Sequence, residues 1–177
     1  MKIVAFGASS NSKSINQQLA SYAAGIAANQ HGASLDILDI NNYEMPLFSQ
    51  DKEEVLGQPE QAKAFYAKLG EADAIIISFA EHNGTYTAAY KNLFDWTSRI
   101  DMKVFQNKPM VLLSTSPGPG GASTVLAQAN ASASHFSADV KGFLSIPSFY
   151  DNFDGKLQIL TNNELKDKLE TTLALLA

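Results

Sequence analysis

The chain has 177 residues, of which 45% are hydrophobic, and it carries a formal net charge of −5. This length and apolar content predict a single domain over residues 1–177 that buries roughly two thirds of its unfolded surface. The acidic balance disfavours a nucleic-acid partner. Because the chain has no Cys, disulfides, thiolate metal sites and cysteine nucleophiles are excluded. No leader-like segment or run of about 18 apolar residues occurs, so we expect a cytoplasmic protein that makes no membrane contact.

Short apolar runs alternate with segments of helical periodicity along the chain. The runs predict strands over residues 2–6, 34–38, 74–79 and 110–114, with a weaker fifth strand near 139–143. Strands that alternate with helices are typical of an α/β fold with a parallel sheet.

The helices are predicted from apolar spacing and from their terminal residues. In the first, Ser14 and Gln17 form a capping box, and His31-Gly32 closes the helix. The others are predicted over 58–70, after Asn83-Gly84 with Lys91 and Asp95 spaced to pair, over 123–136, and from a second capping box at Thr161 and Glu164. Residues 41–57 and 145–155 have no clear period and are predicted to be long surface loops of functional importance.

Ligands of open α/β sheets bind beyond the carboxyl ends of the strands, so the loops that follow the strands carry the functional prediction. The first of these loops, residues 7–14, is rich in serine and leads into a helix. Free N–H groups at a helix start, the helix dipole and small hydroxyls together favour a phosphate site. The alternative is an ordinary Ser- and Asn-rich turn.

Two further loops follow strands at the same edge. Residues 80–87 contain Asn83-Gly84, where glycine lets the backbone approach a flat ligand, or where the pair merely supplies turn dihedrals. Residues 115–123 contain Ser116-Pro117-Gly118 and Gly120-Gly121, which expose amides or form a flexible connection. No Gly-Lys-Ser/Thr follows, so this third loop is not a Walker P-loop.

Taken in order, the three loops and the segment Lys91-Asn92-Leu93-Phe94-Asp95-Trp96 resemble the NADPH-dependent FMN reductase family. This family includes azoreductases, quinone reductases and chromate reductases. The resemblance spans nearly the whole chain. It implies a flavodoxin-like three-layer α/β sandwich with a five-stranded parallel sheet in the order 2-1-3-4-5, and a homodimer or homotetramer.

The resemblance also implies how FMN is held. The first loop would hold the phosphate, the second would lie along the isoalloxazine, and the third would flank the flavin on the other side. The implied cofactor-binding residues are Ser9, Asn11, Ser14, Ile15, Asn16, Glu81, His82, Asn83, Gly84, Ser116, Pro117, Gly118 and Gly121. Where family members usually carry an Arg in the first loop, this chain has Asn11, so Lys13 would supply the positive charge.

The implied activity is NAD(P)H-dependent reduction of a quinone, azo compound or free flavin by ping-pong hydride transfer through bound FMN. NADPH or NADH is the co-substrate, and no catalytic side chain is expected because the flavin carries the chemistry. Two alternatives stay open: a flavodoxin-type electron carrier without NAD(P)H turnover, and a flavin-free binding or regulatory protein.

The sequence lacks the residue patterns that metal-binding and Rossmann-type dinucleotide-binding proteins require. The three histidines lie on different elements, so no metal site is expected. Asp36 and Asp39 stand where a dinucleotide fold keeps its ribose-binding acid, but the Gly-x-Gly-x-x-Gly turn is missing, and we interpret them as solvated strand-end residues. The helix with Tyr90, Leu93, Phe94 and Trp96 is apolar on more than one stripe, which predicts burial against the sheet or a homodimer interface.

Overall fold

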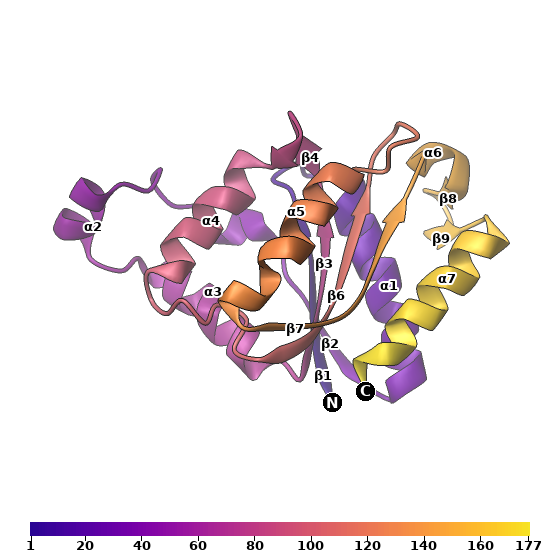
Figure 1. Cartoon of the computed structure of the whole chain (residues 1–177), viewed down its shortest axis with the longest axis horizontal. Coiled ribbons are helices and arrows are strands. Elements are labelled where there is room, and N and C mark those ends of the chain that lie inside the picture. Colours follow the sequence, from indigo (N-terminus) through magenta and orange to yellow (C-terminus); the bar gives the residue numbers. More distant parts are fainter.

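The computed structural model describes all 177 residues and has a parallel sheet at its centre (Figure 1). The five strands are β1 (Lys2–Ala8), β2 (Ser34–Ile37), β3 (Ala74–Phe79), β6 (Lys108–Thr115) and β7 (Ala138–Ile146). Their spatial order is β2-β1-β3-β6-β7, with every pair parallel. This is the predicted flavodoxin-like order 2-1-3-4-5.

Helices cover both faces of the sheet. The longer ones are α1 (Ile15–His31), α3 (Glu60–Glu71), α4 (Ala88–Ser98), α5 (Ser123–Ala133) and α7 (Asn163–Leu173). The short elements are η1 (Ile40–Tyr43), α2 (Gln50–Leu56), η2 (Ser134–Phe136), α6 (Phe149–Asn152) and η3 (Ala174–Leu176), with the hairpin strands β4 (Glu81–His82), β5 (Thr85–Tyr86), β8 (Phe153–Asp154) and β9 (Ile159–Leu160). Residues of α3, α4 and α5 share one core with the sheet, and residues of α1 and α7 share the other. No helix is both long and apolar enough to cross a bilayer.

The two cores follow from the alternation of side chains along a strand. In β1, Ile3 and Ala5 face the core with α1, while Val4 and Phe6 face the core with α3 and α4. Every residue of β3 is buried, which explains its unbroken apolar run.

The prediction that residues 41–57 and 145–155 form surface loops was wrong in part. Residues 41–57 include most of η1 and all of α2, and Ser49 caps α2 by accepting a hydrogen bond from Lys52 N at 3.1 Å. Residues 145–155 include the end of β7, α6 and β8, because Phe149 and Phe153 are buried in the core with α1. The fifth strand is also longer than predicted, since a register shift opposite Met110 and Val111 lets β7 continue past Lys141.

Two capping predictions need correction. Ser14 does cap α1, but the side chain of Gln17 does not return to it: Gln17 Oε1 accepts from Gly7 N at 2.6 Å and Gln17 Nε2 donates to the Leu38 carbonyl at 3.0 Å. The last helix is capped by Asn162, which accepts from Leu165 N, rather than by Thr161. In the first helix, the side chain of Gln17 is bonded to other backbone groups. In the last helix, Asn162 takes the capping position expected for Thr161.

The interpretation of Asp36 as a solvated strand-end residue was also wrong. Its carboxylate lies 2.8 Å from Lys68 Nζ and 3.4 Å from Lys2 Nζ. The hydrogen bond from Lys68 is the largest cause that lowers the pKa of Asp36 below 3.8. This network joins β1, β2 and α3.

The second apolar stripe of α4 is covered by the chain itself. Trp96 is fully buried, its Nε1 donates to the Pro46 carbonyl at 2.7 Å, and its ring meets Phe48 edge to face at 5.0 Å between centroids. The predicted pairing of Lys91 with Asp95 is confirmed at 2.6 Å. The residues after η1 therefore explain why α4 is apolar on two sides.

Candidate functional site

A cleft of about 260 Å³ lies where β1, β3 and β6 end, between the three loops selected from the sequence. It is lined by Ser9, Asn11, Lys13, Ser14, Ile15, Asn16, Ala80, Glu81, His82, Thr115, Ser116, Pro117 and Tyr150. Of the predicted residues, Asn83, Gly84, Gly118 and Gly121 lie in the same loops but do not line the cleft.

The first loop leaves hydrogen-bond donors free. The backbone N–H groups of Ile15 and Asn16, at the first turn of α1, donate to no protein acceptor. Ser9 Oγ and Ser14 Oγ accept from the N–H groups of Asn11 and Gln17 at 3.3 and 3.1 Å, so their own hydroxyl protons remain available. Lys13 makes no ion pair. These groups can together bind an anion at the positive end of the helix dipole.

The side chain of Asn16 is directed into the fold. Its Oδ1 accepts from Ser78 Oγ at 2.7 Å and from Thr115 N at 3.1 Å, and its Nδ2 donates to the Thr115 carbonyl at 3.1 Å. Asn16 is only 2% exposed. It ties the start of α1 to the ends of β3 and β6, and what it offers to the cleft is its backbone N–H.

Gly7 is required for this arrangement. A Cβ at Gly7 would collide with backbone atoms of Asn16 and Gln17, so only glycine lets α1 start against the end of β1. The sequence analysis placed Gly7 in the first loop but gave it no role. Its role follows from the close contact between the start of α1 and the end of β1.

The second loop is a hairpin, β4-β5, with Asn83 and Gly84 at its tip. Both have positive φ, 53° and 78°, as a two-residue type I′ turn requires. The Asn-Gly pair therefore supplies turn dihedrals. The hairpin is fastened to α5, because Glu81 Oε2 accepts from Val125 N at 2.9 Å and Thr85 Oγ1 donates to Gln128 Oε1 at 2.8 Å.

The third loop is tied to β7 and α6, so it is not a flexible connection. The Gly121 carbonyl accepts from Ser114 Oγ at 2.7 Å and from Ser145 Oγ at 2.8 Å. The Gly118 carbonyl accepts from Ser148 N at 2.9 Å. Gly121 has a φ of 57°, and a Cβ there would collide with Ser145 Oγ, so this glycine is needed for packing against β7.

Tyr150 lines the cleft and was not among the predicted site residues. Its neighbour Phe149 is buried and stacks on Phe153 at 4.6 Å between ring centroids, which leaves Tyr150 70% exposed on α6. The signal available in the sequence was the aromatic run of residues 149–153 in a segment expected to be functional.

In the hairpin, burial raises the pKa of Tyr86 above 10.0. No three His, Asp or Glu side chains are grouped as a metal site requires.

The fold and the cleft define a flavodoxin-like α/β protein with a polar cleft at the carboxyl end of its sheet. Residues 1–151 match the family described as NADPH-dependent FMN reductase, and the chain belongs to this family. It is accordingly an oxidoreductase of the NAD(P)H-dependent FMN and quinone reductase type.

Among curated relatives, a 2-hydroxy-1,4-benzoquinone reductase of a Burkholderia species is 34% identical over 131 residues, which cover 73% of this chain and 67% of that protein. An NAD(P)H-dependent FMN reductase of Pseudomonas aeruginosa is 30% identical over 121 residues, 68% of this chain and 63% of that protein. The chain thus spans about two thirds of these relatives. The solved structure of FerB, a flavoenzyme NAD(P)H:(acceptor) oxidoreductase from Paracoccus denitrificans, aligns with a TM-score of 0.76 at 20% identity, over 99% of this chain and 94% of that one. That similarity shows the shared fold.

Proposed function

We propose that the cleft binds FMN non-covalently and that the protein uses NADH or NADPH to reduce a small quinone-type acceptor. The observation that carries the proposal is the set of unused donors in the first loop. Two backbone N–H groups, two hydroxyls and the Lys13 ammonium belong to residues that line one cleft, and none of these donors has an acceptor in the protein. A phosphate dianion is the ligand that such a set of donors fits best.

The phosphate is held without an arginine fork. Asn11 stands near the position where the family usually has Arg, and its Oδ1 accepts from Lys13 N at 2.9 Å. Asn11 therefore shapes the loop, while Lys13 contributes a point charge that is more sensitive to salt than a bidentate contact. We expect FMN affinity to fall as ionic strength rises.

The other two loops would accommodate the ring. Glu81 and His82 of the second loop line the cleft together with Ser116 and Pro117 of the third, so a planar ring would lie between these two loops. Because Glu81 is bonded to α5 and Gly118 to the start of α6, both walls are preorganised. Bound FMN would supply the redox chemistry, taking a hydride from NAD(P)H and passing it to the acceptor.

We further propose one domain over residues 1–177, a cytoplasmic location where NAD(P)H is supplied, and assembly as a homodimer or homotetramer. Support for assembly comes from the projecting segment around α2 (Figure 1), where Leu47, Val55 and Leu56 are 72%, 83% and 53% exposed. Apolar side chains gathered in this way mark interaction surfaces. Size-exclusion chromatography with light scattering tests this proposal, and a monomeric mass would contradict it.

The enzymatic proposal is tested by adding FMN to the purified protein and recording flavin fluorescence and absorbance, then NAD(P)H oxidation with a benzoquinone. Saturable binding at micromolar FMN followed by turnover is expected. FMN binding without turnover would instead indicate an electron carrier of the flavodoxin type. No binding at micromolar FMN would overturn the proposal.

A further inference from the structure

A second cleft, of about 320 Å³, lies directly beside the first. It is lined by Ser10, Ile40, Asn41, Glu44, Met45, Leu47, Ala88, Ala89 and Asn92. Ser9 and Asn11 line the first cleft whereas Ser10 lines the second, so the backbone of one loop separates the two. A volume of this size falls within the range of small-molecule sites.

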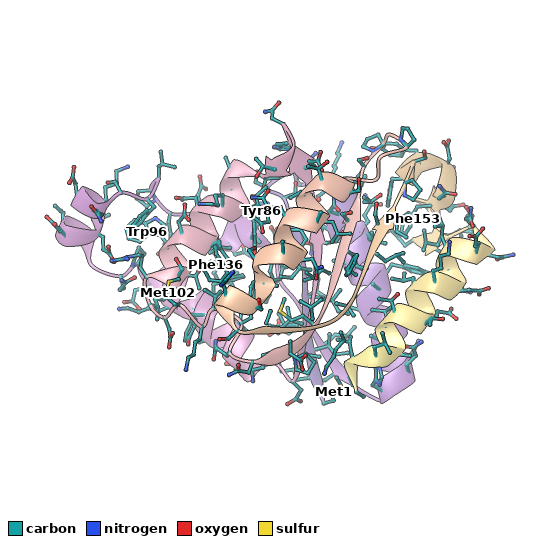
Figure 2. The ribbon with its side chains drawn as sticks, in the orientation of Figure 1. Met1, Tyr86, Trp96, Met102, Phe136 and Phe153 are labelled. Carbon is teal, nitrogen blue, oxygen red and sulfur yellow. The ribbon has the colours of Figure 1, made fainter.

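The walls of the second cleft are held in place. Asn92 Nδ2 donates to the carbonyls of Met45 and Pro46 at 3.2 Å, and its Oδ1 accepts from Phe48 N at 2.8 Å. Trp96, labelled in Figure 2, adds its bond to the Pro46 carbonyl. The segment after η1 is thereby attached to α4, and the cleft between them is preformed.

The polar groups in this cleft that have no partner are the Glu44 carboxylate, which is negatively charged, and the Ser10 hydroxyl, which is neutral. Asn92 is fully used, but the Glu44 carboxylate makes no ion pair and accepts no hydrogen bond, and the hydroxyl of Ser10 is free. Asp39 adds a second carboxylate close by, accepting from Asn41 N at 2.9 Å. The cleft is lined by no cationic side chain.

Three cationic side chains on the elements around the second cleft already have partners in the protein. Lys52 Nζ donates to the Leu47 carbonyl at 3.0 Å, Lys91 pairs with Asp95, and Arg99 pairs with Glu53 at 3.0 Å. The free ammonium of Lys13 borders the first cleft. The second cleft is therefore lined mainly by apolar side chains, and Glu44 is the one charged residue among those that line it.

We propose that the second cleft binds the adenosine end of NADH, with Glu44 accepting hydrogen bonds from the ribose hydroxyls. This inference rests on the proposed function, since it names the hydride donor. Ile40, Met45 and Ala89 provide apolar contacts for the base. A carboxylate that accepts from a ribose 2′-OH favours NAD, whereas the 2′-phosphate of NADP needs a cation in the same place. The cleft thus selects NADH over NADPH.

The test is the ratio of kcat/KM for NADH to that for NADPH, measured on the FMN-loaded protein and on two variants. We expect wild type to favour NADH at least tenfold. Glu44→Lys should abolish or reverse this preference, because it replaces a repulsive charge by an attractive one. Glu164→Lys makes the same charge change at an exposed position of α7 that does not line the cleft, and it should keep the wild-type ratio.

Calorimetric titration with NAD⁺ and NADP⁺, with and without FMN, gives a second readout that does not need turnover. Tighter binding of NAD⁺ to wild type, lost in Glu44→Lys but kept in Glu164→Lys, supports the inference. Equal affinities in wild type, or equal effects of the two variants, would overturn it while leaving FMN binding and quinone reduction untouched. Failure of FMN to bind would instead remove the proposed function, and the titrations without FMN would still decide whether NAD⁺ is selected.

Discussion

The first and third loops of the cleft have similar compositions but opposite use of their polar groups. In the first loop, the hydroxyls of Ser9 and Ser14 and the N–H groups that open α1 have no protein acceptor. In the third loop, the carbonyls of Gly118 and Gly121 are bonded to β7 and to the start of α6. The donors of the first loop are thus free for the proposed ligand, whereas the carbonyls of the third loop hold the scaffold together.

The difference teaches that a loop rich in Ser and Gly is a candidate site only when its donors are left without partners. Asn16 shows both situations in one residue, since its side chain is bonded inside the fold while its N–H borders the cleft.

Gly121→Ala should destabilise the protein by roughly 2–4 kcal/mol, because the new methyl group collides with Ser145 and must adopt a positive φ. Gly120→Ala is the matched control: its φ is not positive and its Cβ would meet nothing within 4 Å, so stability should change by less than about 0.5 kcal/mol. Urea unfolding measures both. Equal stabilities of the two variants would show that the third loop is not a scaffold.

Ser14→Asp should weaken FMN binding by about 100-fold or more while the fold stays stable. Asp caps a helix as well as Ser does, but it would place a carboxylate against the phosphate. Ser49→Asp makes the same change at the cap of α2, away from the cleft, and should leave FMN affinity unaltered. An unchanged dissociation constant in Ser14→Asp would mean that the phosphate is bound elsewhere.

Asn16→Ala should lower the free energy of unfolding by about 1–3 kcal/mol, because the buried N–H of Thr115 loses its acceptor. Ser78→Ala removes only the hydrogen bond to Asn16 Oδ1 and should have a smaller effect, about 1 kcal/mol. Chemical denaturation of both variants compares them. If Asn16→Ala were as stable as wild type, Asn16 could not be the residue that joins the first and third loops.

Asp36→Asn should have the smallest effect, and one that depends on pH. Because Lys68 and Lys2 lower the pKa of Asp36 below 3.8, the ionised carboxylate stabilises the fold above that pH, and the contribution is lost as pH falls through the lower folded pKa. Wild type should exceed the variant in stability at pH 7 and match it near pH 2. Thermal unfolding at both values measures this, and FMN affinity at pH 7 should not change. A stability difference that persisted at pH 2 would contradict the assignment.

Sequence patterns were sufficient for the sheet and for the position of the cleft. Apolar runs located β1, β3 and β6 to within a few residues, since buried central strands need continuous hydrophobic side chains. The edge strand β2 was located as well, although its residues are mostly exposed. The rule that ligands bind beyond strand ends then identified the three loops. By contrast, α2 and α6 were missed because both are short and their periodicity is weak, and Tyr150 was missed with them.

The sequence by itself thus determined the fold class and the family, because these depend on local spacing and strand order, and it predicted an anion site at the serine-rich helix start. Only the tertiary structure decided which polar groups remain free. The partners of Asn16 and Gly121 lie up to 99 residues away along the chain, and no local pattern records them. The second cleft beside Ser10 has the same origin: the segment after η1 meets α4 there through Asn92, and Glu44 is left without a partner.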